Sequence, residues 1–249
     1  MEVHAHTHTA RKKWTHYLWE FLMLFLAVFC GFLAENFREH QVERQKGREY
    51  IESFYEDLKI DTTRLSYLIG FETKKIATLG QVHGCYDSLS KNLQPASFLS
   101  IIKNSLSNNP FLMDGRTIRQ LTNAGGFRLL PKVDADSIVA YEKNGNNLLE
   151  YQQSLYQQTQ DNLRNTFNEV ISFVPYSKLY SDVANIPLPD ATATDEFLLF
   201  RTDKVYLNKY FNQLFQYLRV ITQHRNGLRN FNNRATNQIN YFKNKYHFE

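Results

Sequence analysis

The sequence predicts an all-α protein in which an N-terminal transmembrane helix continues into an elongated antiparallel helical bundle. Apolar residues recur at spacings of three, four and seven over long stretches, which is the pattern of helices packed lengthwise. No stretch of useful length alternates apolar and polar residues as a strand would. Residues 21–34 are all apolar or glycine, and counted from Tyr17 the run reaches 18 residues with Glu20 as its one charge. That length is close to the minimum for a membrane-spanning helix.

Residues 1–13 are predicted to be a polar tail. Three histidines alternate in it, His4, His6 and His8, and neutral imidazoles this close together can chelate a transition-metal ion such as Ni²⁺, Cu²⁺ or Zn²⁺. Ordering an unstructured tail around a metal costs conformational entropy. A solvated tail without a bound metal is therefore the favoured interpretation, and the sequence predicts no cofactor.

Residues 14–36 are predicted to be the transmembrane anchor. A basic cluster and then aromatic residues mark its first end, as at a bilayer boundary: Arg11, Lys12, Lys13, Trp14, Tyr17 and Trp19. Glu20 follows His16 by four residues, so both side chains lie on one helix face at that boundary, where they can pair or share a proton. A carboxylate with a function inside the membrane is the alternative.

A cleaved export signal and a lipoprotein signal both fit less well than a permanent anchor. Cleavage after Ala34 would place Phe32 where a small residue is required. A lipoprotein signal would modify Cys30, but the bulky Phe29 directly precedes it. The sequence therefore favours an uncut anchor.

Small residues inside the anchor suggest a contact between copies of the chain. Ala27 and Gly31 lie four residues apart and form a small-xxx-small pair that lets two helices approach closely. A homo-oligomer is thus one expected partner. With Cys30 inside the anchor and Cys85 outside it, no intrachain disulfide is expected.

Residues 37–249 are predicted to form one helical-bundle domain, large enough to bury a real core. From Trp14 to Gly70 only Gly31 and Gly47 interrupt a strongly helical composition, which indicates one long helix or two in series. Its apolar seam comprises Ile51, Phe54, Leu58, Leu65 and Leu68. Asp57 and Asp61 lie four residues apart and could bind a metal, but without a matching motif elsewhere a capping or solvated role is favoured.

The middle of the domain is rich in turns. Between Pro95 and Pro110 a short amphipathic helix is expected, with Phe98, Ile101, Ile102 and Leu106 on its apolar face. The segment 114–136 then predicts a turn, a helix over 117–123, a stop at Gly125 and Gly126, and a cap for the next helix at Asp134 or Asp136. The paired glycines permit a ligand contact, but a helix stop is the favoured interpretation.

Two long helices are expected to complete the bundle. The first covers about 136–173, with Leu149, Tyr156, Leu163 and Val170 spaced by seven. The second covers roughly the last 40 residues, and its seam comprises Leu207, Phe211, Leu214, Leu218, Ile221, Leu228, Phe231, Ala235, Ile239 and Phe242. A proline-rich loop or strap near 174–193 is expected between them.

Three stretches carry a resemblance to a known family. They are KKWTHYLWEFLMLFLAVFCGFLAENFREHQVERQKGREYIESFYEDLKIDTTRL, RTIRQLTNAGGFRLL and DSIVAYE. The chain resembles a family of uncharacterised single-pass membrane proteins of the Bacteroidota, most closely around the anchor and the helix after it. The resemblance implies an inner-membrane anchor and a helical domain in the periplasm, and it implies no activity.

The function expected from the residues is non-enzymatic. The phosphate-cradling, dinucleotide, zinc-protease, serine-hydrolase and paired-cysteine motifs are all missing. From Arg201 onward nine Lys or Arg accompany two acids and many aromatics, a composition that can bind nucleic acid. The aromatics fall on the core seam, however, so the favoured interpretation is that this basic last helix pairs with the acid-rich first helix. Binding to an anionic lipid or envelope polymer is the next interpretation, and nucleic acid is not expected.

We expect a membrane-anchored interaction or scaffold module of the cell envelope, with the bilayer and a protein partner or second copy as its contacts. A periplasmic ligand-sensing bundle is the alternative, and it needs a partner protein because thirteen residues before the anchor are too few for a folded output domain. Positive residues flank the anchor on both sides, so their number does not decide the orientation. The compact cluster 11–13 favours a cytoplasmic N-terminus and a periplasmic bundle.

Overall fold

The computed structural model describes residues 14–179 and 197–248. His4, His6 and His8, and most of the predicted proline-rich strap, lie outside the described residues. The helices are, in chain order, α1 (Trp14–Leu79), α2 (Val82–Leu89), α3 (Ala96–Ser105), α4 (Arg116–Asn123), η1 (Gly126–Leu129), α5 (Lys132–Tyr151), η2 (Gln152–Tyr156), α6 (Gln157–Val170), α7 (Phe173–Lys178) and α9 (Lys204–Tyr246). The all-α prediction is confirmed. Within the described ranges, β-type pairing is limited to one bridge between Ile171 and Leu199.

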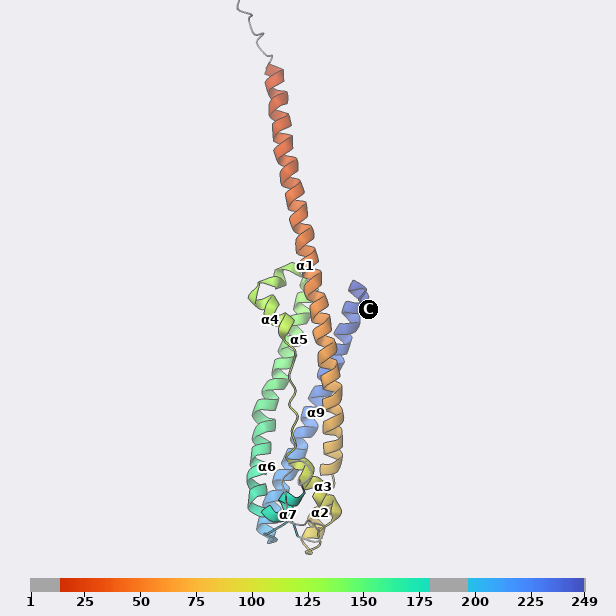
Figure 1. Ribbon diagram of the computed structural model, residues 1–249, viewed down its shortest axis with the longest axis vertical. Coiled ribbons are helices and arrows are strands. Elements are labelled where there is room, and N and C mark those ends of the chain that lie inside the picture. The colour runs from red at the N-terminus through yellow and green to blue at the C-terminus, as the bar shows by residue number, and fades with distance from the viewer. Residues whose placement is uncertain (1–13, 180–196, 249) are drawn as a thin grey trace, which may run out of the picture.

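Three long rods lie side by side, formed by α1, by α5 with α6, and by α9 (Figure 1). The α9 rod runs antiparallel to the other two. The α1 rod and the α5–α6 rod run in the same direction, because residues 106–115 return along the bundle as an extended connection rather than as a helix. The small helices α2, α3 and α7 close the far end of the bundle, and α4 packs near the end from which α1 emerges.

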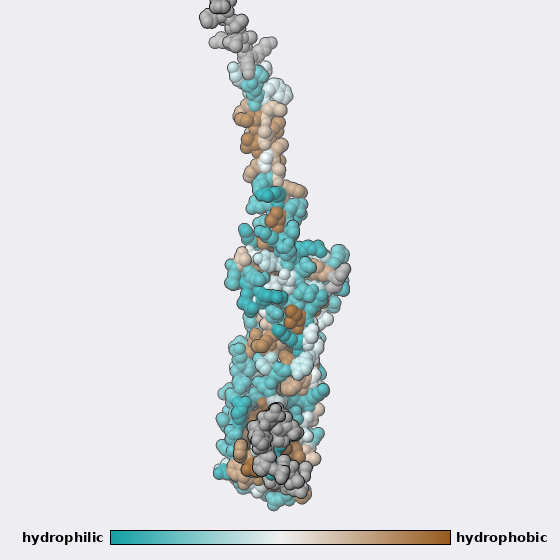
Figure 2. Space-filling view, in the orientation of Figure 1, coloured by the Kyte–Doolittle hydropathy of each residue, from teal (hydrophilic) through white to brown (hydrophobic). Residues whose placement is uncertain are grey.

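The first part of α1 stands outside the bundle. Every residue from Trp14 to Val42 is exposed, and the stretch is long and apolar enough to cross a membrane. Figure 2 shows it as a hydrophobic band at the projecting end of the molecule. A buried core helix is therefore not its role in this fold.

The bundle begins where a glycine lets η1 approach α1. A Cβ at Gly47 would lie 2.5 Å from the carbonyl oxygen of Leu129, so any side chain there would push the two segments apart. Gly125, with φ of 62°, ends α4 as the sequence predicted. The long first helix is continuous from Trp14 to Leu79, and the expected seam from Ile51 to Leu68 is buried.

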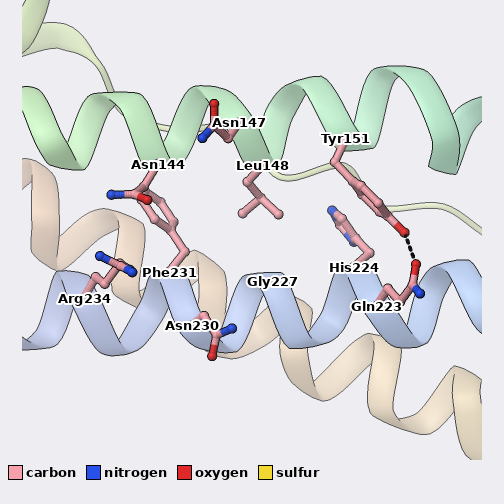
Figure 3. A pocket seen from close by; sticks show the side chains of 10 residues that line it. All are labelled: Asn144, Asn147, Leu148, Tyr151, Gln223, His224, Gly227, Asn230, Phe231 and Arg234. Carbon is pink, nitrogen blue, oxygen red and sulfur yellow. Dashed lines mark hydrogen bonds between the residues drawn. The ribbon is translucent and has the colours of Figure 1, made fainter.

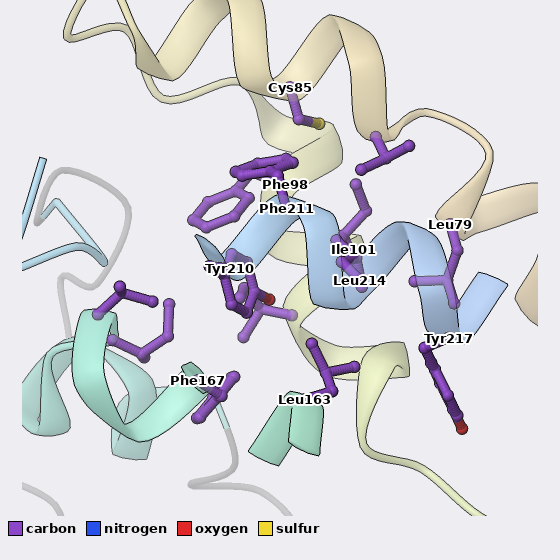
Figure 4. Packing of buried hydrophobic residues seen from close by; sticks show 14 of the residues in the cluster. Leu79, Cys85, Phe98, Ile101, Leu163, Phe167, Tyr210, Phe211, Leu214 and Tyr217 are labelled. Carbon is purple, nitrogen blue, oxygen red and sulfur yellow. The ribbon is translucent and has the colours of Figure 1, made fainter. Parts of the chain in front are cut away.

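The core contains two apolar clusters, one after the other along the rods. The proximal cluster, nearer the projecting part of α1, contains Phe54, Leu121 and Phe231, and the distal cluster contains Phe98, Leu163 and Tyr210. In the distal cluster Phe98 of α3 stacks against Phe211 of α9, with ring centroids 6.4 Å apart (Figure 4). The space between the clusters is filled by polar side chains.

Three expectations about helix ends are wrong. The helix predicted from Asp136 begins at Lys132, with Pro131 as its N-cap residue, so neither Asp134 nor Asp136 caps it. Asp134 instead accepts hydrogen bonds from Lys245 Nζ and from the Tyr241 hydroxyl, both at 2.7 Å. The predicted strap also begins with a helix, α7, because proline is tolerated in a first helical turn.

Candidate functional site

A buried polar layer lies between the two apolar clusters. Glu72 and Lys75 of α1 and His224 of α9 are each 2% exposed. On α1 they continue the three-four spacing of the core, since Leu68, Glu72, Lys75 and Leu79 are all buried. On α9, His224 lies between the buried Ile221 and Leu228 at the same spacing. Burying ionisable groups is costly unless they are paired and hydrogen-bonded. The contacts of this layer therefore decide what it can do.

Glu72 and His224 form the central pair. Glu72 Oε1 lies 2.7 Å from His224 Nδ1, which joins α1 directly to α9. The remaining atoms, Glu72 Oε2 and His224 Nε2, have no hydrogen-bond partner among the described residues. With Nδ1–H directed at the Glu72 carboxylate, Nε2 is an acceptor in a neutral imidazole and a donor in a protonated one.

Lys75 occupies the next turn of α1. Its Nζ donates hydrogen bonds to the carbonyl oxygen of Ser107 and to the hydroxyl of Tyr217, the latter at 2.5 Å. The Tyr217 hydroxyl lies 3.2 Å from that of Tyr156. Burial lowers the pKa of Lys75 to about 7, against the opposing attraction of Glu72. Burial also raises the pKa of Tyr156, to about 12.

A groove between α5 and α9 reaches His224 from the surface. It encloses about 340 Å³. Figure 3 shows Leu148 and Tyr151 projecting from α5 toward α9, and His224 and Phe231 projecting from α9 toward α5. The lining residues are Asn144, Asn147, Leu148, Tyr151, Gln223, His224, Gly227, Asn230, Phe231 and Arg234. They include four carboxamides, one guanidinium and no carboxylate.

Tyr151 closes the His224 end of the groove. Its ring is stacked on the imidazole, with centroids 6.1 Å apart and an interplanar angle of 8°. The Tyr151 hydroxyl donates to Gln223 Oε1 at 3.0 Å. The imidazole is thus held between the Glu72 carboxylate and an aromatic face, and its orientation is fixed.

No protein-family model, curated protein or solved structure matches the chain. What the site can do is therefore argued from its own geometry. The polar layer can hold a proton between α1 and α9, and the groove can present donors and acceptors to a small polar molecule.

Asp57 caps a helix, one of the two roles that the sequence favoured, whereas Asp61 holds the turn before that helix, and both are buried rather than solvated. Asp57 accepts from the backbone N–H of Thr117 at 3.0 Å and from Arg116 at 2.6 Å, which satisfies the first turn of α4. Asp61 accepts from the N–H of Asp114 at 2.8 Å and from the Tyr141 hydroxyl at 2.7 Å. Burial raises the pKa of Asp61. Within the described residues no cluster of metal-binding side chains occurs.

The predicted membrane-boundary residues lie together on the first turns of α1. Trp14, His16, Tyr17, Trp19 and Glu20 are all exposed there, and His16 Nε2 lies 3.2 Å from Glu20 Oε1, as their spacing predicted. The predicted packing residues Ala27 and Gly31 are exposed on the same helix. Whether they serve a membrane boundary and a helix contact stays a prediction.

Sequence reasoning missed the polar layer, although a signal for it existed. Ile51, Phe54, Leu58, Asp61, Leu65, Leu68, Glu72, Lys75 and Leu79 alternate by three and four without a break. Charged residues in such positions are predicted to be buried and therefore to have partners. The expected seam stopped at Leu68, and on the last helix it named Leu218 instead of Tyr217 and omitted His224.

Proposed function

We propose that the protein is a single-pass membrane-anchored, non-enzymatic scaffold or interaction module that holds a helical bundle at a fixed distance from the bilayer. The observation that carries this proposal is the unbroken helix α1, whose exposed apolar part and buried core part share one backbone. A bundle built on the anchor helix itself cannot turn or tilt independently of the anchor.

The length of the connection supports a spacing role. Between Asn36 and Gly47, α1 contains no glycine or proline, and the rise from the first to the second is about 16 Å at 1.5 Å per residue. A salt bridge between Glu35 and Arg38 at 2.7 Å lies on this part of the helix. The bundle surface is thereby set off from the membrane by a stiff spacer.

The location proposed is the bacterial inner membrane, with the bundle in the periplasm. The compact basic cluster before the anchor favours this orientation. The proposed contacts are the bilayer, a partner protein or a second copy, and an anionic lipid or envelope polymer. The composition of α9 supports an anionic contact, because Lys204–Tyr246 contains eight Lys or Arg and no acid. Nucleic acid is not proposed.

Membrane fractionation and a topology reporter test the anchor. The full chain and its Glu20→Leu variant are expected to resist alkaline extraction from membranes, whereas Leu24→Lys/Phe25→Lys is expected to be released. An export-dependent reporter fused after Glu249 is expected to be active. Release of the unaltered chain would reject the anchor, and an active cytoplasmic reporter at the same position would reverse the orientation.

Crosslinking in native membranes tests the spacer. A photo-crosslinking residue at Tyr67, which is exposed on the bundle, is expected to capture a defined partner. Replacing residues 37–46 by a Gly-Ser segment of equal length keeps the composition of the bundle but makes the spacer flexible. The same partner captured with undiminished yield would show that a fixed distance is not needed.

The Glu72–His224 pair favours a second candidate, a ligand-sensing bundle that signals through a partner protein. Glu72 lies on the anchor helix and His224 lines the α5–α9 groove, so a change in the groove can reach α1 through one contact. A scaffold keeps the same crosslinked partner in all conditions. A sensor gains or loses that partner when the groove is occupied.

A further inference from the structure

We propose that the groove between α5 and α9 is a binding site for a short acidic oligosaccharide. The proposal goes beyond the scaffold function, and it rests on the groove's functional groups, on one unsatisfied buried atom and on the dimensions of the site. A ligand found there would also favour the sensing alternative over the scaffold.

The functional groups of the lining fit a ligand with many hydroxyls. Asn144, Asn147, Gln223 and Asn230 supply carboxamides from both walls, and each carboxamide offers donors and an acceptor in one plane. Neighbouring hydroxyls of a sugar ring are matched by such groups because each hydroxyl also donates and accepts. Leu148 and Phe231 add apolar surface between the walls, against which the C–H face of a sugar can pack (Figure 3).

The charge of the lining selects an acidic ligand. Arg234 lies at one end of the groove, is exposed, and makes no ion pair within the described residues. No carboxylate lines the groove to compete with an anionic ligand. A guanidinium binds a carboxylate through two parallel hydrogen bonds, so a sugar acid is preferred over a neutral sugar at this end.

The other end of the groove offers a buried imidazole nitrogen to a ligand hydroxyl. Figure 3 shows the His224 imidazole pointing from α9 toward α5, into the space between the helices. Its Nε2 is buried without a partner, and its Nδ1 lies 2.7 Å from Glu72 Oε1. A ligand hydroxyl both donates and accepts, so it can form a hydrogen bond with Nε2 whether the ring is neutral or protonated. Acetate and other simple carboxylates have no group for this position.

The dimensions indicate two or three sugar units. Arg234 and His224 are ten residues apart on α9, a separation of about 15 Å along the helix. The volume of about 340 Å³ lies at the small end of the range for ligand pockets. Gly227, between these residues, keeps the groove open near Leu148, since a Cβ there would lie 3.1 Å from Leu148 Cδ1.

Calorimetric titration of the full chain in detergent micelles tests the site. Trigalacturonate is the probe, and maltotriose, galacturonate, acetate and triglutamate are the comparisons. Trigalacturonate is expected to bind at least tenfold more tightly than each of them. If maltotriose binds equally tightly, the charge of the ligand plays no role. If galacturonate or acetate binds equally tightly, the site does not extend over several sugar units. If triglutamate binds more tightly, the ligand is not a saccharide. No binding of trigalacturonate would overturn the site.

Matched variants assign the binding to the groove. Arg234→Gln is expected to weaken trigalacturonate roughly tenfold or more, the effect of losing a charge-assisted hydrogen-bond pair, and to leave maltotriose unchanged. Arg229→Gln is the control, because Arg229 is exposed on the same helix outside the groove. Equal losses in the two variants would mean that the charge of α9 acts without a defined site.

The spectrum of His224 provides an independent reading. Nitrogen-15 chemical shifts of the imidazole are expected to show Nε2 gaining a hydrogen bond when trigalacturonate binds, while Nδ1 stays bonded to Glu72. An unchanged Nε2 resonance at saturation would exclude the hydroxyl contact. Folding of every variant is checked by its helical circular dichroism before titration.

Discussion

At the level of single residues, the polar layer lowers the stability of the bundle but provides a specific contact between α1 and α9. Glu72, Lys75 and His224 occupy positions that an apolar side chain would fill at lower desolvation cost. The Glu72–His224 contact at 2.7 Å is then the feature that sets the register of α9 on α1. Polar groups in core positions are best known for such a register role.

Removing one member of the pair should cost more than removing both. Glu72→Leu leaves His224 Nδ1 buried without an acceptor, so we expect a loss of about 1–3 kcal/mol in the free energy of unfolding. The double variant Glu72→Leu/His224→Leu replaces both groups by apolar ones and should recover most of that loss. Urea unfolding of the single and double variants measures the coupling, and additive losses would contradict a direct pair.

Lys75 should make stability depend on pH. Its pKa in the folded protein, about 7, is below its unfolded value of 10.5. Between these values the unfolded chain binds more protons, so the free energy of unfolding rises with pH, by at most about 1.4 kcal/mol per pH unit. Below pH 7 the contribution is constant, because both states are protonated.

Urea unfolding of the unaltered chain and of Lys75→Met, measured from pH 6 to pH 10, tests this pH dependence. Above pH 7 the free energy of unfolding of the unaltered chain is expected to rise relative to that of Lys75→Met. Lys74 is an exposed neighbour, so the difference between the unaltered chain and Lys74→Met is expected to stay constant with pH. Parallel curves for Lys75→Met and the unaltered chain would show that Lys75 is charged throughout this range.

At the level of elements, the π-helical turn η2 keeps two apolar faces aligned. Leu148 and Tyr156 are both buried although they are eight residues apart, and Leu155 is exposed. The extra residue shifts the buried face by one position. Gln152 in the same turn bonds both backbone groups of Phe111, at 2.8 and 3.2 Å, and so holds the extended return segment against the bundle.

Deleting Leu155 should convert η2 to regular α-helix at little cost. The deletion reduces the spacing from Leu148 to Tyr156 to seven residues, which a continuous helix accommodates, and it leaves Gln152 in place. We expect the thermal midpoint to change by less than about 4 °C, equivalent to roughly 1–2 kcal/mol for a domain of this size. Deletion of the exposed Asn162 in α6 is the control and should destabilise strongly, because it rotates the buried face that follows.

This turn also marks a limit of what the sequence predicts. The spacing by seven of Leu149, Tyr156, Leu163 and Val170 predicted one regular helix with these residues on its buried face. In the structure Leu148 rather than Leu149 is buried. Long helices, the stop at Gly125 and the short helix α4 follow from local patterns. The role of Asp57 depends on Thr117, sixty residues away, and the Glu72–His224 pair spans 152 residues. Such contacts depend on how the rods align, which one sequence does not encode locally.

At the level of the whole molecule, α1 combines an exposed apolar stretch with the core of the bundle. The bundle surface and the apolar stretch are therefore in a fixed rotational relation, which a flexible linker would not give. If two copies contact each other through one face of this stretch, the same faces of their bundles are brought together. Any contact between the apolar stretches of two copies thus also determines which surfaces of their bundles meet.

Cys30 offers a direct test of that contact. It is exposed, unpaired and three residues from Ala27, so it lies close to the small-residue face formed by Ala27 and Gly31. Close helix approach at these residues should bring the Cys30 thiols of two copies within reach of an oxidant in native membranes, giving a disulfide-linked dimer. Cys85 is buried and does not compete.

Gly31→Ile should reduce this dimer several-fold, because a branched side chain prevents close packing at a small-residue interface. Val28→Ile is the control: it also adds bulk in the apolar stretch, but outside the Ala27–Gly31 pair. The crosslinked fraction is read from non-reducing gels at equal protein density in the membrane. A Cys30-dependent dimer that persists in Gly31→Ile would place the contact on another face of α1, and with it another surface of the bundle.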